Sequence, residues 1–169
     1  DSFNFTVNDG KADSLAQATL TIDVTAVNDL PTAADKTVTA TEDTALGFAV
    51  ADFGFSDVDT SDQLQSITIT TLSSTGTLTL DGSTVAFDQT ISQADIAAGK
   101  LAFTPATNAN GTDYDSFKFT VNDGSADSSA SSTMTIDVTA VNDLPTANDK
   151  KITAMESTTF VFAASNFGF

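Results

Sequence analysis

The feature that most constrains this sequence is a long internal repeat. Residues 1–55 align without gaps on residues 115–169, and roughly seven in ten of the aligned residues are identical. The offset of 114 residues between the two copies is the size of a whole domain and is too long for the repeating unit of a solenoid. The chain is therefore predicted to hold about one and a half copies of one domain in tandem.

A nine-residue connector, Thr-Ala-Val-Asn-Asp-Leu-Pro-Thr-Ala, marks the boundaries between the copies. It occupies residues 25–33 and 139–147, each time after a run of alternating polar and apolar residues. Proline fixes the backbone, so this composition suits a short and stiff linker. We expect residues 1–29 to close one repeat, residues 30–142 to form a complete one, and residues 143–169 to begin a third.

The two partial copies do not add up to a whole domain. Together they lack the equivalent of residues 56–114 of the complete copy. We therefore expect the chain to be a segment of a continuous or polymerised array of such domains.

Polar–apolar alternation predicts about seven short strands in the complete copy. The strand-like runs are residues 36–40, 45–50, 64–69, 77–80, 85–87, 101–103, 117–121 and 134–138. One short helical turn is predicted at residues 92–99, where Ser92 can cap the start and Gly99 can end it. The partial copy at residues 3–24 is predicted to add two half-buried strands joined by a turn. Short strands separated by frequent turn signals favour an all-β sandwich.

The charge of the chain excludes several classes of partner. The net charge is −17, with 21 Asp, only 2 Glu and no Arg. A surface this acidic repels phosphate backbones and anionic lipid, so we expect neither nucleic acid nor a membrane surface as a partner. No apolar run is long enough to span a bilayer, so no direct membrane insertion is expected.

The residue types that are missing limit the chemistry. The chain has no Cys and no His, so thiolate chemistry and the commonest general base are both absent. An enzyme is therefore not expected; a glycosidase that uses two carboxylates, with Asp57 as one of them, is the least favoured hypothesis. The bias towards Asp has a different meaning, because Asp is a turn former and a short oxygen ligand for hard cations.

The predicted topology gathers acidic and amide side chains at the two ends of the sandwich. With consecutive antiparallel strands, successive loops alternate between the ends. The end near the first connector is expected to hold Asn28, Asp29, Asp57, Asp59 and Asp123. The opposite end is expected to hold Glu42, Asp113, Asp115, Asn142 and Asp143. Six to eight such oxygens suit Ca²⁺, although each residue could instead lie in a plain solvated turn.

These motifs resemble cadherins and the cadherin-like repeats of large bacterial surface adhesins and secreted calcium-binding proteins. The segment Val27-Asn28-Asp29-Leu30-Pro31 resembles the linker between domains of that family. Glu42 matches its first-loop glutamate, Asp57-Val58-Asp59 its Asp-x-Asp loop, and Asp123 its late aspartate. Asp113 and Asp115 stand where the family has Asp-x-Glu. The resemblance implies an Ig-like sandwich whose repeats bind Ca²⁺ at their junctions.

The sequence departs from the family at one ligand and from EF-hands altogether. Ala26 and Ala140 replace the aspartate that opens a cadherin linker, which implies one or two ions at a junction in place of three. The acidic loop is not an EF-hand, since Asp62 stands where that loop needs Gly, and Thr68 where it needs Glu.

The function that follows is structural. We expect a calcium-rigidified extender module of a long extracellular adhesin or surface fibre. Its expected partners are the neighbouring repeats of the same chain, with self-association into fibres as a further expectation. The alternative is an accessory module that binds polysaccharide, which would need an exposed aromatic platform; Tyr114 is the only aromatic residue other than Phe.

Overall fold

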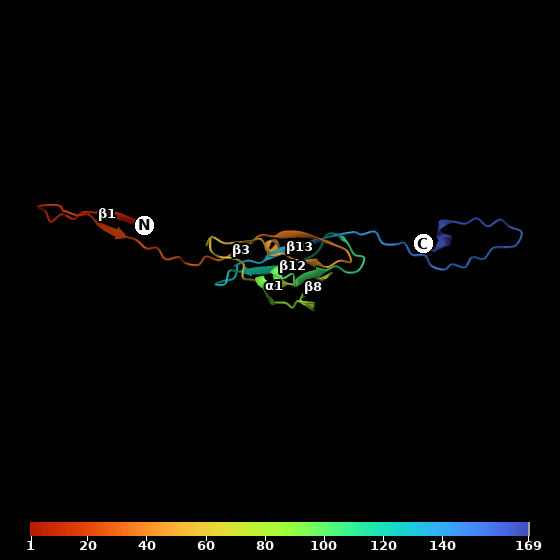
Figure 1. Ribbon diagram of the computed structural model, residues 1–169. Coiled ribbons are helices and arrows are strands. Elements are labelled where there is room, and N and C mark those ends of the chain that lie inside the picture. Colours follow the sequence, from red (N-terminus) through yellow and green to blue (C-terminus); the bar gives the residue numbers. More distant parts are fainter. Residues whose placement is uncertain (169) are drawn as a thin grey trace.

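The computed structural model describes residues 1–168, and a two-layer β-sandwich lies at its centre (Figure 1). The first sheet has the strand order β10-β7-β12-β13-β4, and the second has the order β5-β11-β8-β9. A short pair, β3 with β6, lies beside them. This architecture confirms the predicted all-β sandwich.

The elements of the sandwich follow one another in short steps. They are β3 (Thr32–Ala33), β4 (Lys36–Thr41), β5 (Leu46–Gly47), the 3-10 turn η1 (Val50–Phe53), β6 (Phe55–Ser56), β7 (Ser66–Thr71), β8 (Thr77–Leu80), β9 (Ser83–Thr84), β10 (Thr90–Ser92), helix α1 (Gln93–Ala97), β11 (Leu101–Thr104), β12 (Gly111–Asn122) and β13 (Ser132–Thr139).

The core lies between the two sheets and is centred on phenylalanine rings. Alternate residues of β12 and β13 point inwards, and Phe117 and Phe119 are completely buried. The ring of Phe48 meets Phe117 edge-on at 5.6 Å between centroids, and Phe53 meets Phe119 in the same way at 5.0 Å. Edge-to-face pairs of this kind add about 0.5–1.5 kcal/mol each beyond their buried area.

The pairing of β4 with β13 joins the first and the last strand of the five-stranded sheet in chain order. The two strands run parallel, in a register from Met134 opposite Lys36 to Thr139 opposite Thr41. Both strands therefore start near the first connector and end at the far side of the sandwich. The two connectors consequently leave from opposite ends, as Figure 1 shows.

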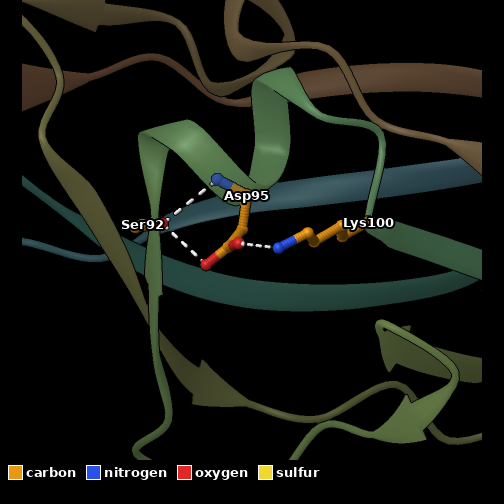
Figure 2. A network of polar contacts seen from close by, with 3 residues as sticks. All are labelled: Ser92, Asp95 and Lys100. Atoms are coloured by element: carbon orange, nitrogen blue, oxygen red, sulfur yellow. Dashed lines mark hydrogen bonds and ion pairs between the residues drawn. The ribbon is translucent and has the colours of Figure 1, made fainter.

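The helical turn forms where the sequence predicts it. The hydroxyl of Ser92 accepts a hydrogen bond from the backbone N–H of Asp95 at 3.1 Å, which confirms the predicted N-cap. Figure 2 shows the rest of this network, in which the Asp95 carboxylate accepts from Ser92 and from the Lys100 ammonium, both at 2.7 Å. The hydrogen bond from Lys100 and then that from Ser92 lower the pKa of Asp95.

Two predicted strands are wrong in part. The run 45–50 pairs only over Leu46–Gly47, because the chain then turns into η1 and buries Phe53 under the sheet. The run 85–87 is not a strand, since β9 ends at Thr84 and Phe87 is 66% exposed. The strand that follows the turn is β9, which is shorter and begins earlier than predicted, and the next strand is β10.

Two arms extend from the sandwich. The N-terminal hairpin consists of β1 (Ser2–Phe5) and β2 (Ala18–Thr21), which pair antiparallel. Its strands were expected to be half-buried, yet all of their residues are exposed. The C-terminal arm, residues 143–168, contains the 3-10 turn η2 (Ala164–Phe167) and, among its described residues, no strand.

Candidate metal centre

Three carboxylates converge at the end of the sandwich that faces the first connector. Asp57 and Asp62 lie in the loop between β6 and β7, and Asp123 lies in the turn after β12. Each offers one oxygen, and these oxygens lie within 4.8 Å of one another. Like charges this close repel unless a proton or a cation neutralises them.

The acidic loop is folded by its own hydrogen bonds. The Asp59 N–H donates to Oδ1 of Asp57 at 2.9 Å, and the Asp62 N–H donates to the carbonyl of Asp59 at 3.0 Å. The second bond turns the chain back, which brings Asp62 beside Asp57. The strand pair β3–β6, with Thr32 opposite Ser56, holds the start of this loop next to the connector.

One oxygen of Asp57 lacks a partner. Its Oδ2 is shielded from solvent and accepts no hydrogen bond, the single buried side-chain oxygen or nitrogen of which this is true among residues 1–168. A buried carboxylate oxygen without a donor is costly, and a cation bound beside it would offset that cost. It is the observation that separates this cluster from ordinary surface acids.

Asp123 is held as an anion by the backbone. Its Oδ1 accepts the N–H groups of Ala126 at 2.7 Å and of Ser125 at 2.6 Å. These two bonds are the main reason that the pKa of Asp123 is lowered. Its other oxygen, Oδ2, is free to face the cluster and the connector.

The connector binds both acidic loops. The Asn28 side-chain amide donates to Oδ2 of Asp123 at 3.1 Å, and the Asp29 N–H donates to Oδ2 of Asp59 at 2.9 Å. A shallow pocket at this point is lined by Ala26, Val27, Asn28, Asp59, Ser61 and Asp62. A carboxamide carries an oxygen as well as a nitrogen, so Asn28 could turn to present a ligand atom.

The donor set fits a hard divalent cation. It consists of carboxylate and amide oxygens alone, with neither sulfur nor imidazole, which is the chemistry that Ca²⁺ prefers. Lysine does not neutralise the cluster: in the described part of the chain the one ion pair joins Lys100 to Asp95. The unpartnered oxygen of Asp57 and the oxygen atoms around it would both suit a hard divalent cation.

The structure brings together the five residues expected at this end and adds a sixth. Asp57 and Asp123 form the cluster, while Asn28, Asp29 and Asp59 join it to the connector. Asp62 is the residue that the sequence analysis considered only as a misplaced EF-hand position. The available signal was its place as the third Asp in the run Asp57–Asp62.

The opposite end is arranged differently, with Glu42 as a buried anchor. Its Oε1 accepts the N–H of Val141, and its Oε2 accepts the Asn110 side-chain amide at 2.7 Å. Both oxygens are thereby engaged, and the second connector is fastened to the sandwich. Asn142 and Asp143 follow as exposed residues, with the Asn142 amide donating to the Asp143 carbonyl at 3.0 Å.

Asp115 has a structural role that its expected place in a metal site did not anticipate. Its two oxygens accept four backbone N–H groups at 2.7–3.0 Å, from Ser74, Thr75, Gly76 and Ser116. Burial opposes ionisation, but these bonds outweigh it and lower the pKa of Asp115. Four donors fill the lone pairs of a carboxylate, which leaves no lone pair free for a metal.

Asp113 makes no hydrogen bond with Glu42 or Asp115 among the described residues. It is exposed, has a positive φ of 48°, and donates its N–H to Oδ1 of Asp137 at 2.8 Å. Among the described residues, three carboxylates gather only at the first connector. The residues expected at the second connector do not form a comparable cluster within this chain.

Comparison with known proteins shows the family to which the complete copy of the repeat belongs. The model of a family described as "Bacterial Ig domain" matches residues 28–139, more than half of the 169-residue chain. A search of curated proteins found no match. The helices of residues 1–168 are all too short or too polar to cross a bilayer.

Proposed function

This chain belongs to the bacterial Ig domain family, and we propose that it is a spacer module whose junction with the preceding repeat is stiffened by Ca²⁺. Domains of this family are structural modules, typically of extracellular or surface proteins. The family therefore supports a role in a surface protein. The calcium-dependent role as an extender in a long adhesin or fibre is our proposal.

The observation that carries the proposal is the contact between the connector and the acidic cluster. Asn28 contacts Asp123 and Asp29 contacts Asp59, so the connector is bonded to both of the loops that supply the cluster around Asp57. A cation held there would be bound by the sandwich and the linker together. Its binding energy would then oppose any swing of the linker away from the sandwich.

The charge of the chain supplies the opposing force. With 23 acidic and 6 basic residues, neighbouring repeats repel one another when nothing neutralises their facing loops. Asn28 and Asp29 contribute one hydrogen bond each to the side chains of these loops, worth about 0.5–1.5 kcal/mol, or about 1.5–3 kcal/mol where a charged group takes part. Calcium is therefore expected to convert a loose hinge into a stiff joint.

Small-angle X-ray scattering with and without calcium tests this proposal. The maximum dimension of the dilute chain should increase, and its flexibility decrease, when Ca²⁺ replaces a chelator. The double variant Asp57→Asn with Asp62→Asn should remain in the flexible state under both conditions. An unchanged maximum dimension of the unmodified chain in calcium and chelator would contradict the proposal.

The surroundings of Tyr114 do not favour the polysaccharide-binding alternative. The Tyr114 hydroxyl accepts the Ala106 N–H at 3.0 Å, and its ring packs against Phe103 at 6.4 Å between centroids. Tyr114 is thus packed into the domain and does not offer an exposed aromatic face on which a sugar could stack. The phenylalanines of the sandwich are likewise buried, apart from Phe55, which is partly buried, and Phe87, which is exposed.

A further inference from the structure

The anchor of the second connector depends on a single side-chain amide. Glu42 is only 3% exposed, and its two carboxylate oxygens accept from different partners. Oε1 accepts the backbone N–H of Val141, and Oε2 accepts from Nδ2 of Asn110 at 2.7 Å. Within residues 1–168, no other donor reaches Oε2. Because a buried carboxylate oxygen needs a donor, the anchor is stable only while residue 110 carries an amide.

The residue after Asn110 makes this amide chemically labile. Asn110-Gly111 is the only Asn-Gly pair in the sequence. An asparagine loses its side-chain amide when the backbone nitrogen of the next residue attacks its Cγ. The attack is easiest where that next residue is glycine, which has no side chain to crowd the nitrogen and whose backbone rotates freely. Deamidation is therefore expected at this pair before any other asparagine of the chain.

The structure leaves the approach to this peptide group open. Asn110 is exposed and lies in the loop between β11 and β12. Gly111 has a φ of 153°, and apart from its chain neighbours no atom lies within 4 Å of the point where a Cβ would stand. The pairing of β12 with β13 shifts its register between Gly111 and Asp115, so the regular ladder is interrupted directly after this peptide group. An irregular backbone and an exposed side chain favour the ring closure that the reaction requires.

The reaction itself needs only water. The Gly111 nitrogen forms a bond to Cγ of Asn110 and gives up its proton, while the bond from Cγ to Nδ2 breaks and Nδ2 leaves as ammonia. The cyclic succinimide then takes up a water molecule and opens. The product is either aspartate or isoaspartate, in which the backbone runs through the side-chain carbon. The folded chain therefore supplies both reacting groups.

Deamidation replaces the donor beside Glu42 by an acceptor. A carboxylate oxygen at the position of Nδ2, 2.7 Å from Oε2 of Glu42, repels it. If the new carboxylate instead turns to solvent, the buried Oε2 is left without a donor. Both arrangements disfavour the buried, ionised Glu42 that holds the N–H of Val141.

We propose that Asn110 is a site of spontaneous deamidation, and that the loss of its amide releases the second connector from Glu42. The linker to the following repeat thus becomes looser as the protein ages. The change lies at the end of the sandwich opposite the metal centre and involves none of that centre's carboxylates. It does not rest on the proposed calcium site, so either proposal can fail without the other.

Mass spectrometry on the full chain tests the modification. The purified chain is kept in mildly alkaline buffer, digested with a protease and analysed by tandem mass spectrometry. The mass increase of deamidation should accumulate at Asn110. Asn108, an exposed asparagine that precedes alanine, is the internal control and should convert several-fold more slowly. Asn110→Gln should remain unmodified over the same time, because glutamine must close a larger ring.

Hydrogen exchange measured by NMR tests the release of the connector. The N–H of Val141 reports its bond to Glu42 directly. In Asn110→Asp, and in the deamidated fraction of the aged parent, this N–H should exchange several-fold faster than in the fresh parent. Asn108→Asp adds the same charge two residues away but leaves the donor of Glu42 in place, so it should exchange like the parent.

Each measurement has an outcome that overturns the proposal. Equal conversion of Asn108 and Asn110, or no conversion of Asn110, would exclude the proposed site. Unchanged exchange at Val141 in both Asn110→Asp and the aged chain would exclude the proposed release. The N–H of Phe117, in the centre of the sandwich, distinguishes a local effect from unfolding, and an equal acceleration there would also contradict the proposal.

Discussion

The side-chain amide of Asn28 and Oδ2 of Asp123 are 95 residues apart in the chain and lie 3.1 Å from each other. This contact joins a linker to the last turn of the domain that follows it. It places the linker on the rim of a carboxylate cluster in which Oδ2 of Asp57 has no partner. The junction and the candidate ion site are therefore one structure, so that ligand binding and linker motion are expected to be coupled.

Calcium should raise the melting temperature of the chain, and the rise should grow with the logarithm of the calcium concentration above the dissociation constant. A ligand that binds only the folded state stabilises it by about 2.7 kcal/mol at 100 times its dissociation constant. Differential scanning calorimetry during a calcium titration measures the effect. Asp57→Asn and Asp62→Asn should each remove most of the shift.

The matched control is Asp113→Asn, an exposed aspartate at the other end of the sandwich. It changes the net charge by the same amount and should leave the calcium-dependent shift intact. A shift that survives Asp57→Asn but disappears with Asp113→Asn would place the ion at the other end.

Asn28→Ala should loosen the linker without weakening the sandwich. The residue is exposed and its amide makes the one side-chain bond from the connector to Asp123, so the domain itself loses no packing. Fluorophores attached at Lys11→Cys and Ser83→Cys report the distance between hairpin and sandwich. We expect a broader distance distribution in Asn28→Ala than in the parent, most clearly in calcium.

The corresponding change in the second connector, Asn142→Ala, serves as the control. Within residues 1–168 the Asn142 side chain bonds only to the carbonyl of its neighbour Asp143, so its loss should leave the same distance distribution unchanged. If both variants broaden it equally, the effect is general and does not come from the contact with Asp123.

The sequence was sufficient to predict which loops meet at the first connector, for a physical reason. In a sandwich of short strands, the loop order determines the end at which each side chain lies, and Asp57, Asp59 and Asp123 follow from it. Asp62 was missed because its position depends on a turn closed by the bond from its N–H to the Asp59 carbonyl. Residue spacing alone does not show such a turn.

Two other features depend on tertiary contacts that alternation cannot reveal. Alternation tells which side chains face the core, but it does not tell which strand is the neighbour or in which direction it runs. The choice of β13 as the neighbour of β4 therefore could not be predicted, although the loop order already required the two strands to run in the same direction. Similarly, the folding of residues 74–76 over Asp115 joins segments about 40 positions apart, and it converts an expected ligand into a structural anchor.

Ser92→Ala should destabilise the sandwich by about 1 kcal/mol, because the N-cap of α1 loses its acceptor for the Asp95 N–H. Chemical denaturation measures this difference. Ser129→Ala is the control: Ser129 is exposed and should be neutral on substitution. Equal stability of the two variants would show that the cap contributes nothing to the domain.

Asp115→Asn should destabilise the domain more strongly, by about 2–4 kcal/mol, since an amide nitrogen would face backbone N–H donors that now lose their acceptor.

The same carboxylate predicts that the stability of the domain depends on pH. Its pKa is lower in the folded chain than the ordinary value of about 3.9, so its contribution is complete above that value and is lost as the pH falls through the folded pKa. Denaturation curves between about pH 6 and pH 2 should therefore show a loss of stability below about pH 4 that is smaller in Asp115→Asn. Asp113→Asn again provides the comparison, and an identical pH profile for the parent and Asp115→Asn would exclude Asp115 as the source.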